Sequence, residues 1–155
     1  MFSLTSPGLI TQKCSFIRYL LIKSLINYNK LHDKFHQEIQ KVKKLQENPN
    51  SKVEEDSEDM TNILRLLQLF AEGHFSDLQN YIRHQTNSYH NYDLLDEISD
   101  LLNEYMEAKH TAFFETMIQC FDTITEFIQG PCVENQNSII QGSFLDLASS
   151  LLSVR

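Results

Sequence analysis

The chain has 155 residues, of which 41% are hydrophobic, and it contains only four glycines and three prolines. This composition allows a single domain with an apolar core, and the scarcity of turn formers favours helices over a β-sandwich or barrel. Residues 1–52 carry nine Lys/Arg against three acids (+6), whereas residues 53–155 carry four against eighteen (−14). The larger acidic part would repel nucleic acid, which argues against a DNA- or RNA-binding protein.

The N-terminal third predicts one long basic helix over residues 11–46. Apolar residues recur there at Leu21, Tyr28, Phe35 and Val42. A spacing of seven is typical of a packed helix or of a short coiled-coil seam. The most apolar stretch, residues 14–28, is interrupted by polar residues and is too short to cross a bilayer, so no transmembrane segment is expected. Such a helix could approach an anionic membrane surface or an acidic partner, or it could lie against the acidic part of the chain itself, and both alternatives stay open.

Turn formers and acids follow this helix. Residues 48–51 read Asn-Pro-Asn-Ser, and residues 54–59 contain five acids and one serine. A turn followed by a self-repelling acidic run is typical of a linker that leads into a helix N-terminus. We therefore place a domain boundary near residue 56. The predicted parts are residues 1–55, a long helix with an acidic linker, and residues 56–155, a helical domain.

Five helices are expected in the second part. The predicted ranges are 60–72, 76–85, 94–105, 111–129 and 139–152, the last with a break at Gly142. The first has an apolar stripe of Ile63, Leu66, Leu67 and Phe70, and the third has one of Leu94, Leu95, Ile98, Leu101, Leu102 and Tyr105. Gly73 and Gly130-Pro131 are typical helix ends. The fold class predicted is all-α, an antiparallel stack of helices of the armadillo-like repeat kind, with a long N-terminal helix.

Two carboxylates stand at unfavourable helix positions. Glu72 continues a polar stripe that includes Gln68, and Glu126 continues one that includes Gln119. Both fall in the last turn of their predicted helices, where the helix dipole disfavours an anion and the last carbonyls lack helical partners. Two such ends brought together would make an oxygen-rich site suited to Ca²⁺ rather than Zn²⁺. On periodicity alone, solvated acids on two separate helix faces are the favoured interpretation.

Two sequence blocks resemble a known family. Residues 66–74 read Leu-Leu-Gln-Leu-Phe-Ala-Glu-Gly-His and lead into residues 77–85, Asp-Leu-Gln-Asn-Tyr-Ile-Arg-His-Gln. Residues 124–132 read Ile-Thr-Glu-Phe-Ile-Gln-Gly-Pro-Cys, followed by Asn135-Gln136. In this order the blocks resemble the RIH-associated domain of the ryanodine and inositol-trisphosphate receptors, over residues 60–153. Ala71 departs from the family, which usually has cysteine there.

The resemblance implies a site and a setting. Glu72 and Glu126 would be side-chain ligands of Ca²⁺, and His74 and Gln129 would hold these carboxylates in place. The family completes the site with a backbone carbonyl from a segment beyond the pore, which this sequence lacks, so a partial site of weak affinity is expected. The resemblance further implies a regulatory, calcium-sensing module of a tetrameric calcium-release channel. It would lie on the cytosolic face of the endoplasmic reticulum, with the pore and C-terminal segment as partners.

Other candidates are weaker. His32 and His36 have metal-compatible spacing but no third ligand, and solvated histidines are the favoured interpretation. Cys120 is expected in the core and Cys132 in a more open place, with the odd set of three cysteines reduced in the cytosol. The sequence contains no phosphate-binding loop and no nucleophile elbow, so we expect no enzyme. The alternative function is a helical protein–protein interaction scaffold, with Phe114 and Phe127 exposed for docking and no ion bound.

Overall fold

A computed structural model describes residues 27–48, 57–73, 76–85 and 90–153. The elements are α2 (Tyr28–Glu47), α3 (Ser57–Ala71), α4 (Ser76–Arg83), α5 (Leu94–Ala108), the 3₁₀-helix η1 (Thr111–Phe113), α6 (Phe114–Ile128), α7 (Val133–Gln141) and α8 (Phe144–Ser153). The described ranges contain no strand, which confirms the all-α prediction. None of their helices has the length and apolarity that a membrane span requires.

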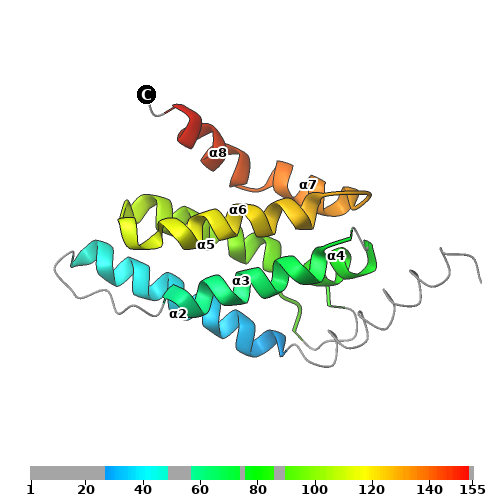
Figure 1. Ribbon diagram of the computed structural model, residues 1–155, viewed down its shortest axis with the longest axis horizontal. Helices are drawn as coiled ribbons and strands as arrows, with labels where there is room; N and C mark the ends of the chain where they lie inside the picture. Colours follow the sequence, from blue (N-terminus) through cyan, green and yellow to red (C-terminus); the bar gives the residue numbers. More distant parts are fainter. Residues whose placement is uncertain (1–26, 49–56, 74–75, 86–89, 154–155) are drawn as a thin grey trace, which may run out of the picture.

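The helices form a stack of two-helix units (Figure 1). Within each unit the helices run in opposite directions, α2 against α3 and α5 against α6. Between units, α2 packs beside α5 and α3 beside α6, and each of these pairs runs parallel. Stacked helical hairpins with this relation are the arrangement of helical repeat proteins. The helical stack expected from the sequence is therefore confirmed, with antiparallel neighbours along the chain and parallel neighbours between units.

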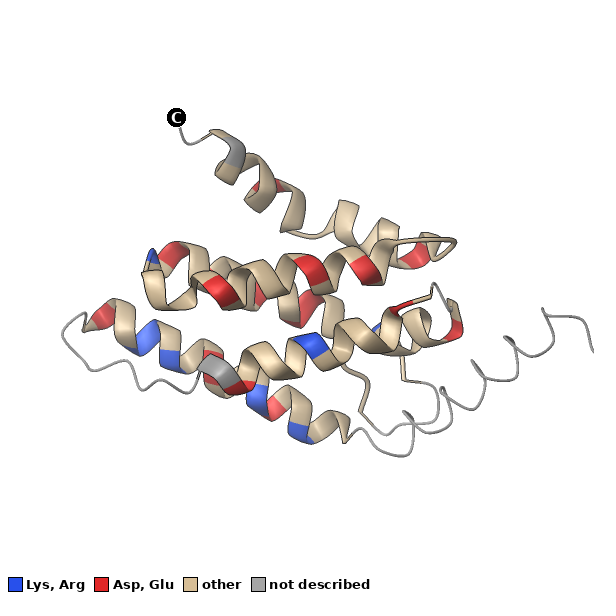
Figure 2. Cartoon of the chain, in the orientation of Figure 1, with Lys and Arg blue, Asp and Glu red and all other residues tan. Residues whose placement is uncertain are grey.

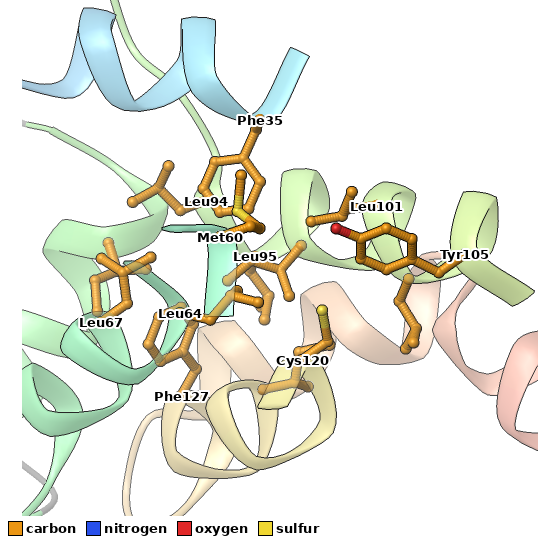
Figure 3. Close-up of a cluster of buried hydrophobic side chains, with 14 of the residues drawn as sticks. Phe35, Met60, Leu64, Leu67, Leu94, Leu95, Leu101, Tyr105, Cys120 and Phe127 are labelled. Carbon is orange, nitrogen blue, oxygen red and sulfur yellow. The ribbon is translucent and has the colours of Figure 1, made fainter. Parts of the chain in front are cut away.

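The core lies between the two layers of helices. Figure 3 shows Phe35, Met60, Leu64, Leu95, Tyr105 and Phe127 converging from α2, α3, α5 and α6. The six apolar residues predicted on α5, from Leu94 to Tyr105, are all fully buried. Helix α5 is thus the central element, because neighbouring helices cover its apolar stripe from both sides. Cys120 also lies in this core, as predicted.

Helix α2 is shorter than the predicted range. It begins at Tyr28, where Asn27 is the N-cap and its Oδ1 accepts a hydrogen bond from the Lys30 N–H. One uninterrupted helix from 11 to 46 is therefore wrong at residue 27, because a capping asparagine in an extended conformation ends the helical ladder on its N-terminal side. Residues 11–26 and the heptad position Leu21 lie outside the described residues. The other three heptad positions are buried, as expected.

The basic helix lies against the acidic part of the chain (Figure 2). Lys43 Nζ is 3.1 Å from Glu104 Oε1 on α5, and Lys34 Nζ is 4.0 Å from Asp59 on α3. Buried side chains of α2 belong to the same core as those of α5. For residues 28–47, this packing supports the second of the two alternatives left open by the charge asymmetry. The acidic linker, residues 49–56, lies outside the described residues.

Two apolar faces differ from the prediction. On α3 the buried residues are Met60, Leu64, Leu67 and Ala71, whereas Leu66 is 50% exposed. The face is rotated because α3 also turns polar residues, among them Gln68, toward α6. On α6, Phe127 was expected to be exposed but is fully buried, whereas Phe114 is 63% exposed as expected.

The predicted helix ends are mostly confirmed. Gly73 and Gly130 have φ values of 86° and 78°, the left-handed conformation that glycine adopts without strain after a helix. The C-terminal helix is broken at Gly142, as expected, and separates into α7 and α8. Helix α7 begins at Val133, six residues before the predicted start at Ile139, because it follows almost directly on the turn at Gly130-Pro131.

The cap of α5 makes stability depend on pH. Asp93 is the N-cap, and its carboxylate accepts hydrogen bonds from the Leu95 and Asp96 N–H groups. Burial, and then the charge of Asp96, raise the pKa of Asp93 from 3.8 to about 6. The folded state therefore binds this proton more tightly than the unfolded chain, so the contribution of Asp93 to stability increases as pH falls through 6.

We expect Asp93→Asn to be more stable than the wild type at pH 7 and to lose this advantage toward pH 4. The amide keeps the capping acceptor without the buried charge, and solvent screening at this half-buried site limits the gain to on the order of 0.5 kcal/mol. Urea unfolding across this pH range measures it. Asp93→Ala, which loses the cap, should be destabilised by about 1 kcal/mol at pH 7. Parallel pH profiles for wild type and Asp93→Asn would contradict the assignment.

Candidate functional site

A polar seam joins α3 to α6. Thr61 Oγ1 is 2.8 Å from Thr116 Oγ1, and Gln119 Nε2 donates to Gln68 Oε1 at 2.7 Å. Thr123 Oγ1 donates to the Leu64 carbonyl at 3.1 Å. Part of each predicted polar stripe therefore lies in the interface between α3 and α6 rather than on a solvated face.

The register of this seam brings the ends of α3 and α6, where Glu72 and Glu126 stand, to about the same level. Partners across it differ by 51, 55 and 59 in sequence number. At the middle offset, Glu72 is level with residue 127, next to Glu126. Glu72 is one turn beyond Gln68, and Glu126 is two turns beyond Gln119, so both carboxylates continue the faces that meet in the seam. Parallel packed helices lie about 8–10 Å apart, a separation that two glutamate side chains can bridge through one cation.

Each carboxylate stands at a helix end that is open to solvent. Glu72 directly follows α3 and is exposed, and its N–H donates to the Gln68 carbonyl. Glu126 is half-buried in the last turn of α6. Both ends carry the negative pole of a helix dipole, which disfavours a carboxylate there and favours a cation.

The terminal carbonyls of α6 are occupied, contrary to the expectation that they are unpaired. Side-chain amides of Gln79, Asn135 and Gln136 cap five consecutive residues, 126–130. Gln79 Nε2 donates to the carbonyls of Glu126 (2.9 Å) and Gln129 (2.8 Å), Asn135 Nδ2 to that of Phe127 (2.9 Å), and Gln136 Nε2 to those of Ile128 (2.9 Å) and Gly130 (3.1 Å). We call these three residues the amide clamp. A cation at this end must therefore be held by carboxylates rather than by these carbonyls.

Sequence reasoning missed the amide clamp. The amide of Gln79, on α4, reaches α6 and is fully buried. The spacing of Asn135-Gln136 after Gly130-Pro131 was a usable signal. A tight turn brings the residues of the next helix back over the end of the previous one, where unpaired carbonyls require donors.

Two further site residues were predicted, Gln129 and His74. Gln129 is the C-cap of α6, with its N–H donating to the Thr125 carbonyl. His74 lies outside the described residues. Within the described ranges, no group of three or more His, Cys, Asp or Glu side chains is arranged to hold a metal ion. Two carboxylates would supply only part of the six to eight oxygens that Ca²⁺ takes.

His32 is only partly exposed and has a structural role that was not expected, whereas His36 is exposed as predicted. Its Nδ1 lies 2.7 Å from Glu97 Oε1 on α5, and its ring stacks on Tyr92 with centroids 4.3 Å apart. Burial raises the pKa of Glu97, and the contact with His32 opposes that shift. The pair of His32 and Glu97 fastens α2 to α5. The ring of His36 stacks on that of His32, with centroids 6.3 Å apart.

Neither described cysteine has the environment of a nucleophile. Burial raises the pKa of the Cys120 thiol, which disfavours the reactive thiolate. Cys132 was expected to be more open, but it is 3% exposed and its Sγ–H donates to Asn80 Oδ1 at 3.4 Å. The turn at Gly130-Pro131 presses it against α4, so both thiols act as packing groups.

Comparison with known proteins identifies the family of this chain. The model of the RyR and IP3R homology associated family matches residues 54–152, a range that contains both carboxylates and the amide clamp. The inositol 1,4,5-trisphosphate receptor itr-1 of Caenorhabditis elegans is 36% identical in an alignment of 101 residues, which covers 58% of this chain. The same alignment covers 4% of that receptor, so the chain spans a small fraction of this relative.

Proposed function

Because this chain belongs to the RyR and IP3R homology associated family, we propose that it is a regulatory module of an intracellular calcium-release channel. In this proposal Glu72 and Glu126 are ligands of a Ca²⁺ ion whose binding is coupled to gating. The observation that carries it is the parallel packing of α3 and α6, which brings the two helix ends to one level (Figure 1). The module would act with the pore-forming part of a tetrameric channel, on the cytosolic face of the endoplasmic reticulum.

The mechanism proposed is ion-driven docking. Without an ion, two carboxylates and two helix dipoles of the same sign repel at this end of the stack. Ca²⁺ removes that repulsion and still needs several more oxygen ligands, which a neighbouring segment of the channel would supply. If the docked arrangement binds the ion more tightly, calcium shifts the gating equilibrium toward it by that difference in affinity. His74 and Gln129 would orient the carboxylates.

The test is a CaCl₂ titration of the ¹⁵N-labelled chain followed by NMR. We expect the amides of residues 72 and 126 to shift with a dissociation constant of about 1 mM or weaker, because two carboxylates make an incomplete site. The double variant Glu72→Gln, Glu126→Gln should lose this response. Glu115→Gln, in the first turn of α6, is the matched control and should keep it. A double variant that responds as the wild type does, or a wild type that does not respond, would reject the calcium site.

The alternative is a helical interaction scaffold that binds no ion, and the exposed apolar surface favours it. Large apolar side chains at least 39% exposed are Leu66, Leu69, Phe114, Ile118, Val133, Ile140, Leu145 and Leu151. An apolar groove between η1, the start of α6 and α8 includes Phe114, Met117 and Leu151. For a scaffold, association with the adjoining channel segment should survive the double glutamine variant and be lost in Leu66→Asp, Leu69→Asp.

A further inference from the structure

We infer that Gln79 is a positioning residue for Glu126, acting through the amide clamp at the end of α6. This inference rests on the proposed calcium site and adds a residue that touches neither the ion nor a carboxylate. Gln79 Nε2 donates to the backbone carbonyl of Glu126 itself at 2.9 Å and to that of Gln129 at 2.8 Å. It therefore holds the last turn of α6 at both of its edges.

The orientation of the Gln79 amide is set by this contact. Turning the amide over would place Oε1 against two carbonyl oxygens, which repel it, so only Nε2 fits there. The side chain is fully buried, and within the described ranges its Oε1 has no hydrogen-bond partner. A glutamine that leaves its own acceptor unpaired shows how strongly the two carbonyls determine its conformation.

The same residue links the two halves of the proposed site. Helix α4, which carries Gln79, begins four residues after Glu72. Asn135 Nδ2 donates both to the Gln79 carbonyl at 3.0 Å and to the Phe127 carbonyl at 2.9 Å, so it fastens the backbone of α4 to that of α6. The amide clamp therefore fixes the backbone of Glu126 relative to α4, the next helix along the chain from Glu72.

The test compares Gln79→Met with Tyr105→Phe. Methionine keeps the volume of glutamine and removes the two donors, whereas Tyr105→Phe removes a buried hydrogen bond to Glu38 between α5 and α2, away from the end of α6. Both variants should be less stable than the wild type, and urea unfolding measures whether the two losses of stability are equal. We expect calcium affinity, from the NMR titration, to fall about tenfold in Gln79→Met and to stay unchanged in Tyr105→Phe. Hydrogen exchange at the Gln129 amide should accelerate in Gln79→Met alone.

A second variant keeps the inference testable if Gln79→Met does not fold. Gln136→Met removes donors at the more exposed side of the clamp, from Ile128 and Gly130, and should weaken calcium binding about threefold. Unchanged affinity in a folded Gln79→Met or Gln136→Met, with a normal wild-type response, would overturn the positioning role alone. A wild type that shows no calcium response would overturn the proposed function and the positioning role together.

Discussion

Phe127→Ala is expected to lower the free energy of unfolding by about 3–5 kcal/mol. The ring is fully buried between α3 and α6, beside Leu64 and Leu67 (Figure 3). Truncation removes a large apolar group from a packed interior and leaves a cavity that rigid helices cannot fill. For a chain of this length such a loss corresponds to a fall in Tm of about 6–20 °C. Urea and thermal unfolding followed by circular dichroism measure both quantities.

Phe114→Ala is the matched control, because the same substitution occurs at the other end of α6 on a side chain that is 63% exposed. It should change the free energy of unfolding by no more than about 0.5 kcal/mol. Equal effects of the two substitutions would show that α6 does not bury Phe127. That result would also remove the register that places Glu126 beside the end of α3.

Asn135→Leu is expected to lower the free energy of unfolding by about 2–5 kcal/mol. Its Nδ2 is the donor for two buried carbonyls, those of Gln79 and Phe127, and the loss of hydrogen bonds to buried groups costs about 1–3 kcal/mol each. The substitution also removes the acceptor of a hydrogen bond from Arg83 Nε at 3.2 Å. Leucine has as many side-chain heavy atoms as asparagine, so no cavity forms, and lost hydrogen bonding together with the added bulk of the methyl groups would account for the effect.

Asn137→Leu provides the comparison on the same helix, since Asn137 is exposed. It should leave stability within about 0.5 kcal/mol of the wild type. If Asn135→Leu were equally harmless, the amide clamp would not stabilise the end of α6. The expected result would instead show that the Asn-Gln pair following Gly-Pro-Cys in the second sequence block closes the end of α6.

The sequence predicted best those helices whose neighbours cover mainly apolar side chains. On α5 the apolar residues recur on one broad stripe, and all six are buried, because neighbours cover that stripe from both sides. On α3 the predicted apolar stripe is displaced by about one residue from the stripe that is buried. Apolar residues are usually buried and polar ones exposed. On α3, however, Leu66 is exposed and Gln68 lies in the interface, because the seam with α6 is partly polar. Periodicity locates an apolar face but does not show which polar residues a neighbour will cover.

The candidate site, too, could be predicted from the sequence only in part. Helix-end positions for Glu72 and Glu126 could be predicted, because Gly73 and Gly130 mark where each helix stops. That the two ends lie side by side could not be predicted from spacing. It depends on the parallel packing of two helices that are separated in sequence by α4 and α5. The hydrogen bonds of Gln79 to α6, 47 and 50 residues away, depend on the same packing.

By itself, the sequence determined that this protein is a set of helices, where most of them stop, which family it belongs to, and which carboxylates stand at helix ends. These properties depend on local conformational preference and on residues close together in the chain. The tertiary structure alone decided that α3 and α6 run side by side in one direction, and that amides from α4 and α7 close the end of α6. Both follow from contacts between distant segments, which are set by how whole helix faces fit together.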